Sequence, residues 1–141
     1  MRKKAAIVWW VLVAVCMGVI FFFSSQNGDA SQALSDGFKI IFGIPVRNSV
    51  IRKTAHFLEF AGLAFLVFNA LRATCGRSRP ALSFILAAAY AVTDEIHQLF
   101  VEGRACRAFD VFIDSCGAAS AILFMMLALY IFKKERLYDR K

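Results

Sequence analysis

Two carboxylates, an imidazole and an amide lie within five positions at the end of a very apolar stretch of the chain. They are Asp94, Glu95, His97 and Gln98 in AVTDEIHQLF, which follows ALSFILAAAY. Carboxylates and imidazoles can transfer protons, bind metals or bind cationic and hydroxylic ligands. A charged side chain at membrane depth costs about 2.5–3.5 kcal/mol on insertion scales, so its presence there indicates a function.

Two other apolar segments also carry polar residues near one end. His56 and Glu59 are three residues apart, and Asp110 and Asp114 are four apart, so each pair shares one face of a helix. Arg and Lys residues beside these segments supply charge partners for the carboxylates. The eleven residues that we expect to form one polar cup are Arg52, Lys53, His56, Glu59, Asp94, Glu95, His97, Gln98, Arg104, Asp110 and Asp114.

Composition identifies the class of protein whose elements must position these groups. The 141 residues are 60% hydrophobic and 19% charged, and the mean hydropathy is +0.61. A soluble domain of this size could not bury so much apolar surface. We therefore predict a single integral membrane domain over residues 1–141. In a membrane protein, the positive charges that make up the net charge of +7 are expected to set the orientation in the bilayer. We therefore expect no nucleic-acid partner.

Four segments are apolar and long enough to cross a bilayer as helices, which takes about 20 residues. They cover residues 5–24, 54–71, 81–101 and 108–132, which predicts an all-α bundle of four transmembrane helices. The opening RKK followed by an apolar run also fits the start of a signal peptide. The run is too long for that and no A-x-A site follows, so we favour a retained helix.

The distribution of Lys and Arg predicts the orientation. Eleven of the seventeen lie on the side of the termini, so we place both termini in the cytoplasm of a bacterial cell. The acids have the opposite distribution, because only Glu135 and Asp139 lie on the terminal side. The polar ends of the second, third and fourth spans then meet at one depth, near the extracytoplasmic surface. Small residues such as Ala87, Ala91 and Gly117 on the same faces predict close helix packing below the cup.

The loop between the first two spans contains an amphipathic pattern. Ala30, Ala33, Leu34, Phe38, Ile41 and Phe42 follow helical spacing, with Asp29 or Ser31 as an expected N-cap. We expect this helix to lie on the outer leaflet or to pack over the bundle.

Several motifs resemble the VanZ-like family. They are FSSQ (residues 23–26), RKTAHFLEF (52–60), AVTDEIHQLFVEGR (91–104), and Asp110 with Gly117 in DVFIDSCGA. The namesake is a bacterial membrane protein associated with low-level resistance to teicoplanin. The resemblance implies that the family's signature positions in this chain are Lys53, His56, Glu59, Asp94, Glu95, Gln98, Arg104 and Asp110.

The chain departs from the family pattern at two positions. Glu102 stands where the family has Pro, and Asp114 stands where it has Asn. Both departures add negative charge to the polar cup.

The favoured hypothesis is a cell-envelope membrane protein whose cup holds an outer-leaflet ligand, such as a lipid headgroup, a cell-wall lipid precursor or a glycopeptide. Arg52, Lys53 and Arg104 would bind its phosphate or carboxylate. Lys39, Arg47 and Arg107 are interpreted as solvated loop charges. A further interpretation is that the polar groups only fix the register of the helices.

The alternative is an intramembrane enzyme that uses acid–base or metal chemistry on a lipid-linked substrate. His56, Glu59, Glu95 and His97 are its candidate groups, but the E-x-H pair faces two sides of a helix, and we predict no cofactor. A transporter is disfavoured, because no inverted repeat is visible and the polar groups stop halfway along the spans.

Overall fold

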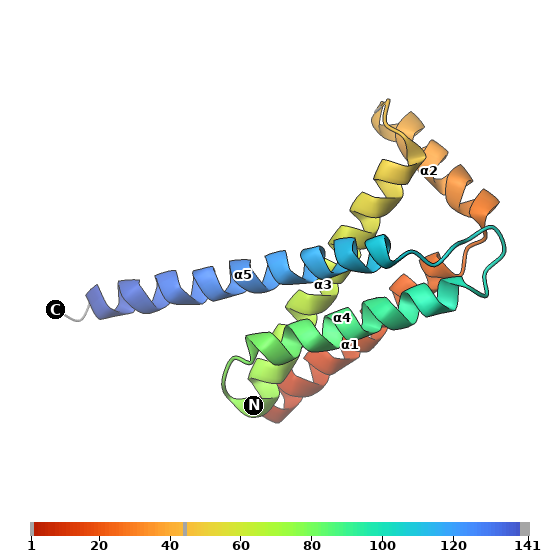
Figure 1. The fold of residues 1–141 in the computed structure, drawn as a ribbon. Helices are drawn as coiled ribbons and strands as arrows, with labels where there is room; N and C mark the ends of the chain where they lie inside the picture. Colours follow the sequence, from red (N-terminus) through yellow and green to blue (C-terminus); the bar gives the residue numbers. More distant parts are fainter. Residues whose placement is uncertain (1, 44, 139–141) are drawn as a thin grey trace.

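The computed structural model describes residues 2–43 and 45–138, with side chains for residues 3–43 and 45–134. That part of the chain is all helical and contains no strand, as the sequence predicts (Figure 1). Its helices are α1 (Arg2–Ser24), α2 (Gly28–Phe42), α3 (Asn48–Cys75), α4 (Pro80–Gln98) and α5 (Ala108–Tyr138).

Three of these helices are long and apolar enough to cross a membrane, by length and composition. The qualifying segments are Lys3–Ser24, Asn48–Cys75 and Ala108–Lys134. The remaining predicted span corresponds to α4, which has 19 residues and carries Asp94, Glu95 and His97 in its last turns. These polar residues lower its hydropathy, so α4 is not among the three.

The helix boundaries differ from the predicted spans at several ends. α3 begins at Asn48 rather than at residue 54, so Arg52 and Lys53 lie within the helix. α3 ends at Cys75 and is capped by Gly76, whose φ of 71° lies in the left-handed region that glycine tolerates. α4 ends at Gln98 and not at residue 101, because the next residues form turns. α5 continues to Tyr138, beyond the predicted end at residue 132.

α3 is the central helix and packs against α1, α2, α4 and α5. α1 and α4 run in one direction, whereas α3 and α5 run in the other, so the C-terminal ends of α1 and α4 lie at the same end as the N-terminal ends of α3 and α5. Beyond the polar groups, the bundle is packed with apolar side chains, among which Phe60, Leu63 and Phe68 of α3 are fully buried. Figure 1 shows the C-terminal part of α5 extending away from the other helices.

Small residues allow the helices to approach closely, as the sequence predicts. Ala87 and Ala91 of α4 are fully buried, and so is Ala118 of α5. A Cβ atom on Gly117 would collide with the backbone carbonyl oxygen of Phe57 in α3. Glycine is therefore required where α5 crosses α3.

α2 begins at Gly28, and its N-cap is Asn27. The Asn27 Oδ1 atom accepts a hydrogen bond of 2.8 Å from the backbone N–H of Ala30. The predicted caps, Asp29 and Ser31, were wrong because both lie inside the helix. The Gly28 N–H donates to the carbonyl of Glu102 over 3.1 Å, so the start of α2 is tied to the loop between α4 and α5.

The two faces of α2 have different neighbours. Ser31 and Ser35 are buried, whereas the apolar residues predicted to form one face are mainly exposed, including Leu34, Phe38 and Ile41. In the second half of α2, Asp36 accepts a hydrogen bond of 3.0 Å from the Asn48 side chain, which links α2 to α3. Burial of these small side chains lets α2 lie close to the bundle, while its large apolar side chains stay mainly exposed.

The N-terminal end of α1 lies beside the turn that joins α3 and α4 (Figure 1). The Trp10 Nε1–H of α1 donates to the Thr74 Oγ1 of α3 over 3.1 Å at that end. Three charges used to predict the orientation, Asp139, Arg140 and Lys141, lie outside the described residues.

Candidate functional site

The polar end of the bundle contains a cavity of about 130 Å³, called here the polar cavity. It lies between the first turns of α3 and α5, the last turn of α4, and the loop between α4 and α5. Seven of the eleven residues predicted for the polar cup line it. Its complete lining is Ser49, Arg52, Lys53, His56, Gln98, Gly103, Arg104, Ala105, Arg107, Asp110, Ile113 and Asp114.

Four cationic side chains and two carboxylates line the polar cavity. Lys53 and Asp110 neutralise each other across 3.2 Å, and the Lys53 ammonium also lies 4.4 Å from the ring centre of Phe109. Within the part of the chain that the structure describes, Arg52 has no ion-pair partner. The cavity wall is therefore predominantly positive.

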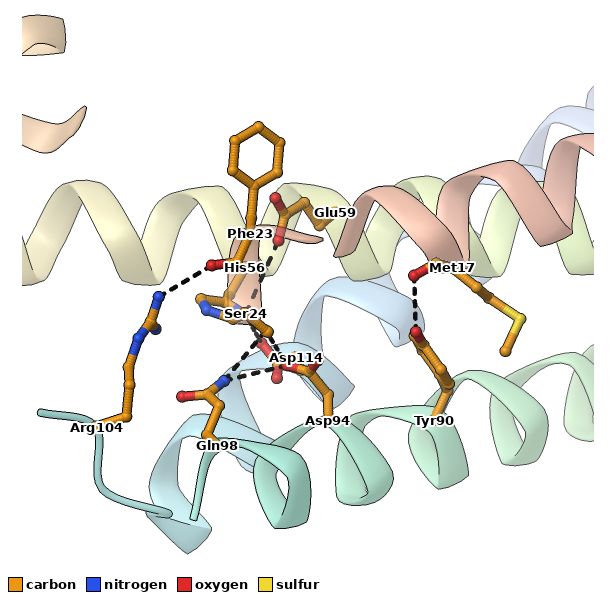
Figure 2. A network of polar contacts seen from close by, with 10 residues as sticks. All are labelled: Met17, Phe23, Ser24, His56, Glu59, Tyr90, Asp94, Gln98, Arg104 and Asp114. Carbon is orange, nitrogen blue, oxygen red and sulfur yellow. Dashed lines mark hydrogen bonds and ion pairs between the residues drawn. The ribbon is translucent and has the colours of Figure 1, made fainter. Parts of the chain in front are cut away.

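Arg104 joins the cavity to the end of α1. Its Nε atom donates to the Gln26 carbonyl over 3.1 Å. Its Nη2 atom donates to the Phe23 carbonyl, also over 3.1 Å (Figure 2). A cation at a helix C-terminus also interacts favourably with the helix dipole. The sequence analysis expected carboxylates as partners of the Arg and Lys residues near the cup, but among the described residues the partners of Arg104 are these backbone carbonyls. Burial and the positive charge of Arg52 lower the pKa of Arg104 from its ordinary value.

His56 lies between two carboxylates at the base of the cavity. Its Nδ1 atom is 3.9 Å from Glu59 Oε2 and 3.9 Å from Asp114 Oδ1 (Figure 2). Both distances exceed those of a hydrogen bond. The Asp114 side chain is 0% exposed, and neither of its oxygens has a hydrogen-bond partner among the described residues. A buried polar group without a partner is destabilising, so Asp114 is an acceptor without a structural donor.

Asp94 belongs to a second group, built by α4 and α1. Its Oδ2 atom accepts hydrogen bonds from Ser24 Oγ over 2.7 Å and from Gln98 Nε2 over 3.1 Å (Figure 2). Further along the same interface, the Tyr90 hydroxyl donates to the Met17 carbonyl over 2.7 Å. The polar cup was predicted from three spans, but α1 contributes a fully buried hydroxyl. The FSSQ segment was the signal for it.

Glu95 and His97 lie outside the polar cavity. Glu95 Oε2 accepts a hydrogen bond of 2.8 Å from the backbone N–H of Arg107, which holds the loop against α4. His97 points toward α1, where its Nε2 is 3.1 Å from Ser25 Oγ and its ring centre lies 4.4 Å from that of Phe21. The E-x-H pair is thus divided between two neighbours, as helix geometry requires.

A second cavity of about 270 Å³, called here the apolar cavity, lies between α2, α3 and the end of α1. Of the residues predicted for the polar cup, Glu59 lines this cavity and not the polar cavity. Arg52, His56 and Arg104 line both cavities and separate them. The complete lining is Phe23, Ser31, Leu34, Ser35, Phe38, Ile51, Arg52, Ala55, His56, Glu59 and Arg104.

Some residues of the site were missed from the sequence. Arg107 is exposed in the loop, as expected of a solvated loop charge, but it also lines the polar cavity, as does Ser49. Their position depends on how the loop folds back onto α3, for which the sequence held no signal. Among the residues that the structure describes, no group of three or more His, Cys, Asp or Glu residues could hold a metal ion.

Comparison with known proteins gives one match. The model of a family described as VanZ/LLP1 matches residues 9–132, which is nearly the whole chain. No curated protein and no solved structure matches the chain.

Proposed function

The chain belongs to the VanZ/LLP1 family, and we propose that it is a membrane protein that binds a phosphate-bearing headgroup of a cell-envelope lipid. The observation that carries this proposal is the polar cavity, where four cationic side chains meet a buried carboxylate without a partner. Such a wall suits a ligand that carries both an anion and hydrogen-bond donors.

The two arginines favour phosphate over other polar groups. Guanidinium groups match the geometry of phosphate and can bind it with two hydrogen bonds. Arg52 and Arg104 line the same two cavities, so an anion bound between them would relieve the repulsion between their positive charges. Asp114 would accept hydrogen bonds from hydroxyl or ammonium groups of the same headgroup.

The size of the cavity favours a lipid headgroup over a whole glycopeptide. Sites for drug-sized molecules usually measure about 300–1,000 Å³, whereas the polar cavity measures about 130 Å³. We therefore favour a phospholipid or a lipid-linked cell-wall precursor as the ligand.

We further propose how the protein lies in the bacterial cytoplasmic membrane. α1, α3, α4 and α5 would span it, α2 would lie at the outer leaflet, and both termini would be cytoplasmic. The excess of Lys and Arg on the side of the termini supports this orientation. The exposed Phe38, Ile41 and Phe42 of α2 support its place at the interface.

Binding of sn-glycerol 3-phosphate, a soluble headgroup, tests the proposal. The affinity of the purified protein would be measured by calorimetry, with glycerol as the uncharged comparison. Arg52→Gln removes a charged hydrogen-bond donor, so it should weaken binding by roughly 10- to 100-fold. Arg47→Gln is the matched control, because Arg47 is exposed just before α3 and lines neither cavity. Equal affinities for the two variants would contradict the proposal.

A second candidate is an acid–base enzyme that acts on the same lipid, and His56 favours it. Its imidazole faces the buried Asp114 carboxylate and also lines the polar cavity. Such a residue can accept a proton from water as the water attacks the phosphorus of a phosphate ester. The P–O bond to the lipid then breaks, and the imidazolium returns the proton to the oxygen of the leaving alcohol. Release of inorganic phosphate from phosphatidic acid, with loss of that release in His56→Gln, would support the enzyme. Intact phosphatidic acid after incubation with wild-type protein would contradict it.

A further inference from the structure

We propose that the apolar cavity holds the hydrocarbon chain of the lipid whose phosphate occupies the polar cavity. The protein would then bind the lipid as a whole, with α2 covering the part of the chain next to the headgroup. This inference rests on the proposed headgroup function and adds the chain as a second recognised part.

The position of the two cavities supports a ligand with a charged head and an apolar tail. They meet at Arg52, His56 and Arg104, which line both. Phosphate bound by the two arginines would therefore lie beside the entrance to the apolar cavity. Beyond these residues, the wall of the apolar cavity carries Phe23, Leu34 and Ile51.

α2 explains how a lipid chain could reach the cavity. Leu34 and Phe38 of α2 line the cavity, whereas the neighbouring Ile40 and Ile41 are 82% and 77% exposed. Side chains with such exposure are stable where membrane lipid covers them. A lipid in the same leaflet could then enter beneath α2 without passing through water.

The polar residues of the apolar cavity lie where a lipid backbone would need them. Glu59 and the buried Ser31 and Ser35 add acceptors and donors to the wall. The Ser35 hydroxyl donates to the Ser31 carbonyl over 3.0 Å. Ester and hydroxyl groups that join a phosphate to its chains would meet these residues, whereas the methylene groups would meet Leu34 and Phe38.

Photo-crosslinking tests where the chain lies. The probe is a phosphatidic acid that carries a diazirine on its acyl chain near the glycerol, at low fraction in phosphatidylcholine nanodiscs with full-length protein. Mass spectrometry should place most crosslinks within residues 31–38 of α2 and 51–59 of α3. An excess of sn-glycerol 3-phosphate should remove most of them, because it competes for the phosphate position.

Two variants fill the cavity, and one leaves it unchanged. Ala55→Phe fills it from α3, and Leu34→Trp does so from an exposed position of α2 that tolerates bulk. Each should reduce the crosslinks at least fivefold while the affinity for sn-glycerol 3-phosphate stays within about twofold of wild type. Ala89→Phe is the control, because Ala89 is exposed on α4 and lines neither cavity.

The outcomes separate this inference from the proposed function. Crosslinks spread evenly over the exposed faces of α1, α4 and α5, with headgroup binding intact, would overturn the chain site alone. Crosslinks in the cavity that persist in Ala55→Phe and Leu34→Trp would overturn it as well. If the wild-type protein does not bind sn-glycerol 3-phosphate at all, both the proposed function and this inference are overturned.

Discussion

The two ends of the helical bundle contain buried residues of opposite kinds. At the packed end, Phe68, Ala70 and Leu71 of α3 are buried with other apolar side chains. At the polar end, Asp94, Glu95 and Asp114 are just as buried, although each is ionisable. The same helices build both ends, so the difference lies in the side chains and not in the backbone.

This difference separates structural residues from candidate functional ones. At the packed end, burial and stability agree, because close contacts between apolar atoms favour the fold. At the polar end, Asp94 is held by Ser24 and Gln98, but Asp114 has no partner among the described residues. A buried acceptor that the fold leaves unpaired reduces stability, which suggests that it serves a ligand.

The largest expected effect is at the packed end. Phe68→Ala removes a side chain that is 0% exposed and leaves a cavity, so it should lower the free energy of unfolding by roughly 3 kcal/mol. Thermal unfolding in detergent would measure this. Phe124→Ala is the control, because Phe124 is 69% exposed and should change stability little. Similar losses in both variants would show that the packed end does not determine stability.

At the polar end, Asp114→Asn should change stability in the opposite direction, that is, it should stabilise the fold. It replaces a buried ionisable group that has no hydrogen-bond partner by a neutral group of nearly the same shape, so the free energy of unfolding should rise by roughly 1–3 kcal/mol. Binding of sn-glycerol 3-phosphate should weaken, because an acceptor for its hydroxyls is lost. The exposed Asp29→Asn should change neither property. A clear loss of stability in Asp114→Asn would show that Asp114 is a structural residue.

A smaller effect is expected from Ser24→Ala. This change removes the hydroxyl that donates to Asp94 over 2.7 Å and leaves Gln98 as the remaining side-chain donor. Stability should fall by about 1–2 kcal/mol. Ser120→Ala is the control, since the Ser120 hydroxyl only donates to the Gly117 carbonyl within the same helix. If the two variants lose equal stability, the bond between α1 and α4 has no special role.

The smallest effect concerns pH at the end of α2. Hydrogen bonds from Lys39 and Asn48 lower the pKa of the exposed Asp36 below its ordinary value of 3.8. A lowered pKa stabilises the fold above the ordinary value, and this contribution is lost as pH falls through the lowered one. Hydrogen exchange of α2 should therefore speed up slightly on acidification below about pH 4. Asp36→Asn should show faster exchange at neutral pH and no such step, and an identical step would contradict the assignment.

Most of the fold and the family were predictable from the sequence. The apolar runs and the polar residues near their ends predicted the long helices, and motifs such as TDEIHQ predicted the family that the family model then matched. The close crossing at Gly117 followed from its small size and is confirmed. The number of spans and the orientation stay predictions.

The details of the site were less predictable because they depend on three-dimensional neighbours. Helical spacing shows that His97 and Glu95 differ in direction, but it does not show that His97 meets Phe21 of α1. Arg104 donates hydrogen bonds to backbone carbonyls, and because every residue has a carbonyl, the sequence does not indicate which ones accept. Arg107 reaches the polar cavity only because the loop after α4 folds back, with its N–H bound to Glu95.

The central claim is that Arg52 and Arg104 hold a phosphate in the polar cavity, and a distance measurement tests it most directly. Rotational-echo double resonance between ³¹P of bound sn-glycerol 3-phosphate and ¹⁵N-labelled arginine, in frozen maltoside micelles free of other phosphorus, reports contact between these atoms. We predict strong dephasing of the ³¹P signal in the wild type and much weaker dephasing in Arg52→Gln. A bound phosphate whose signal shows no dephasing by guanidinium nitrogen would contradict the account.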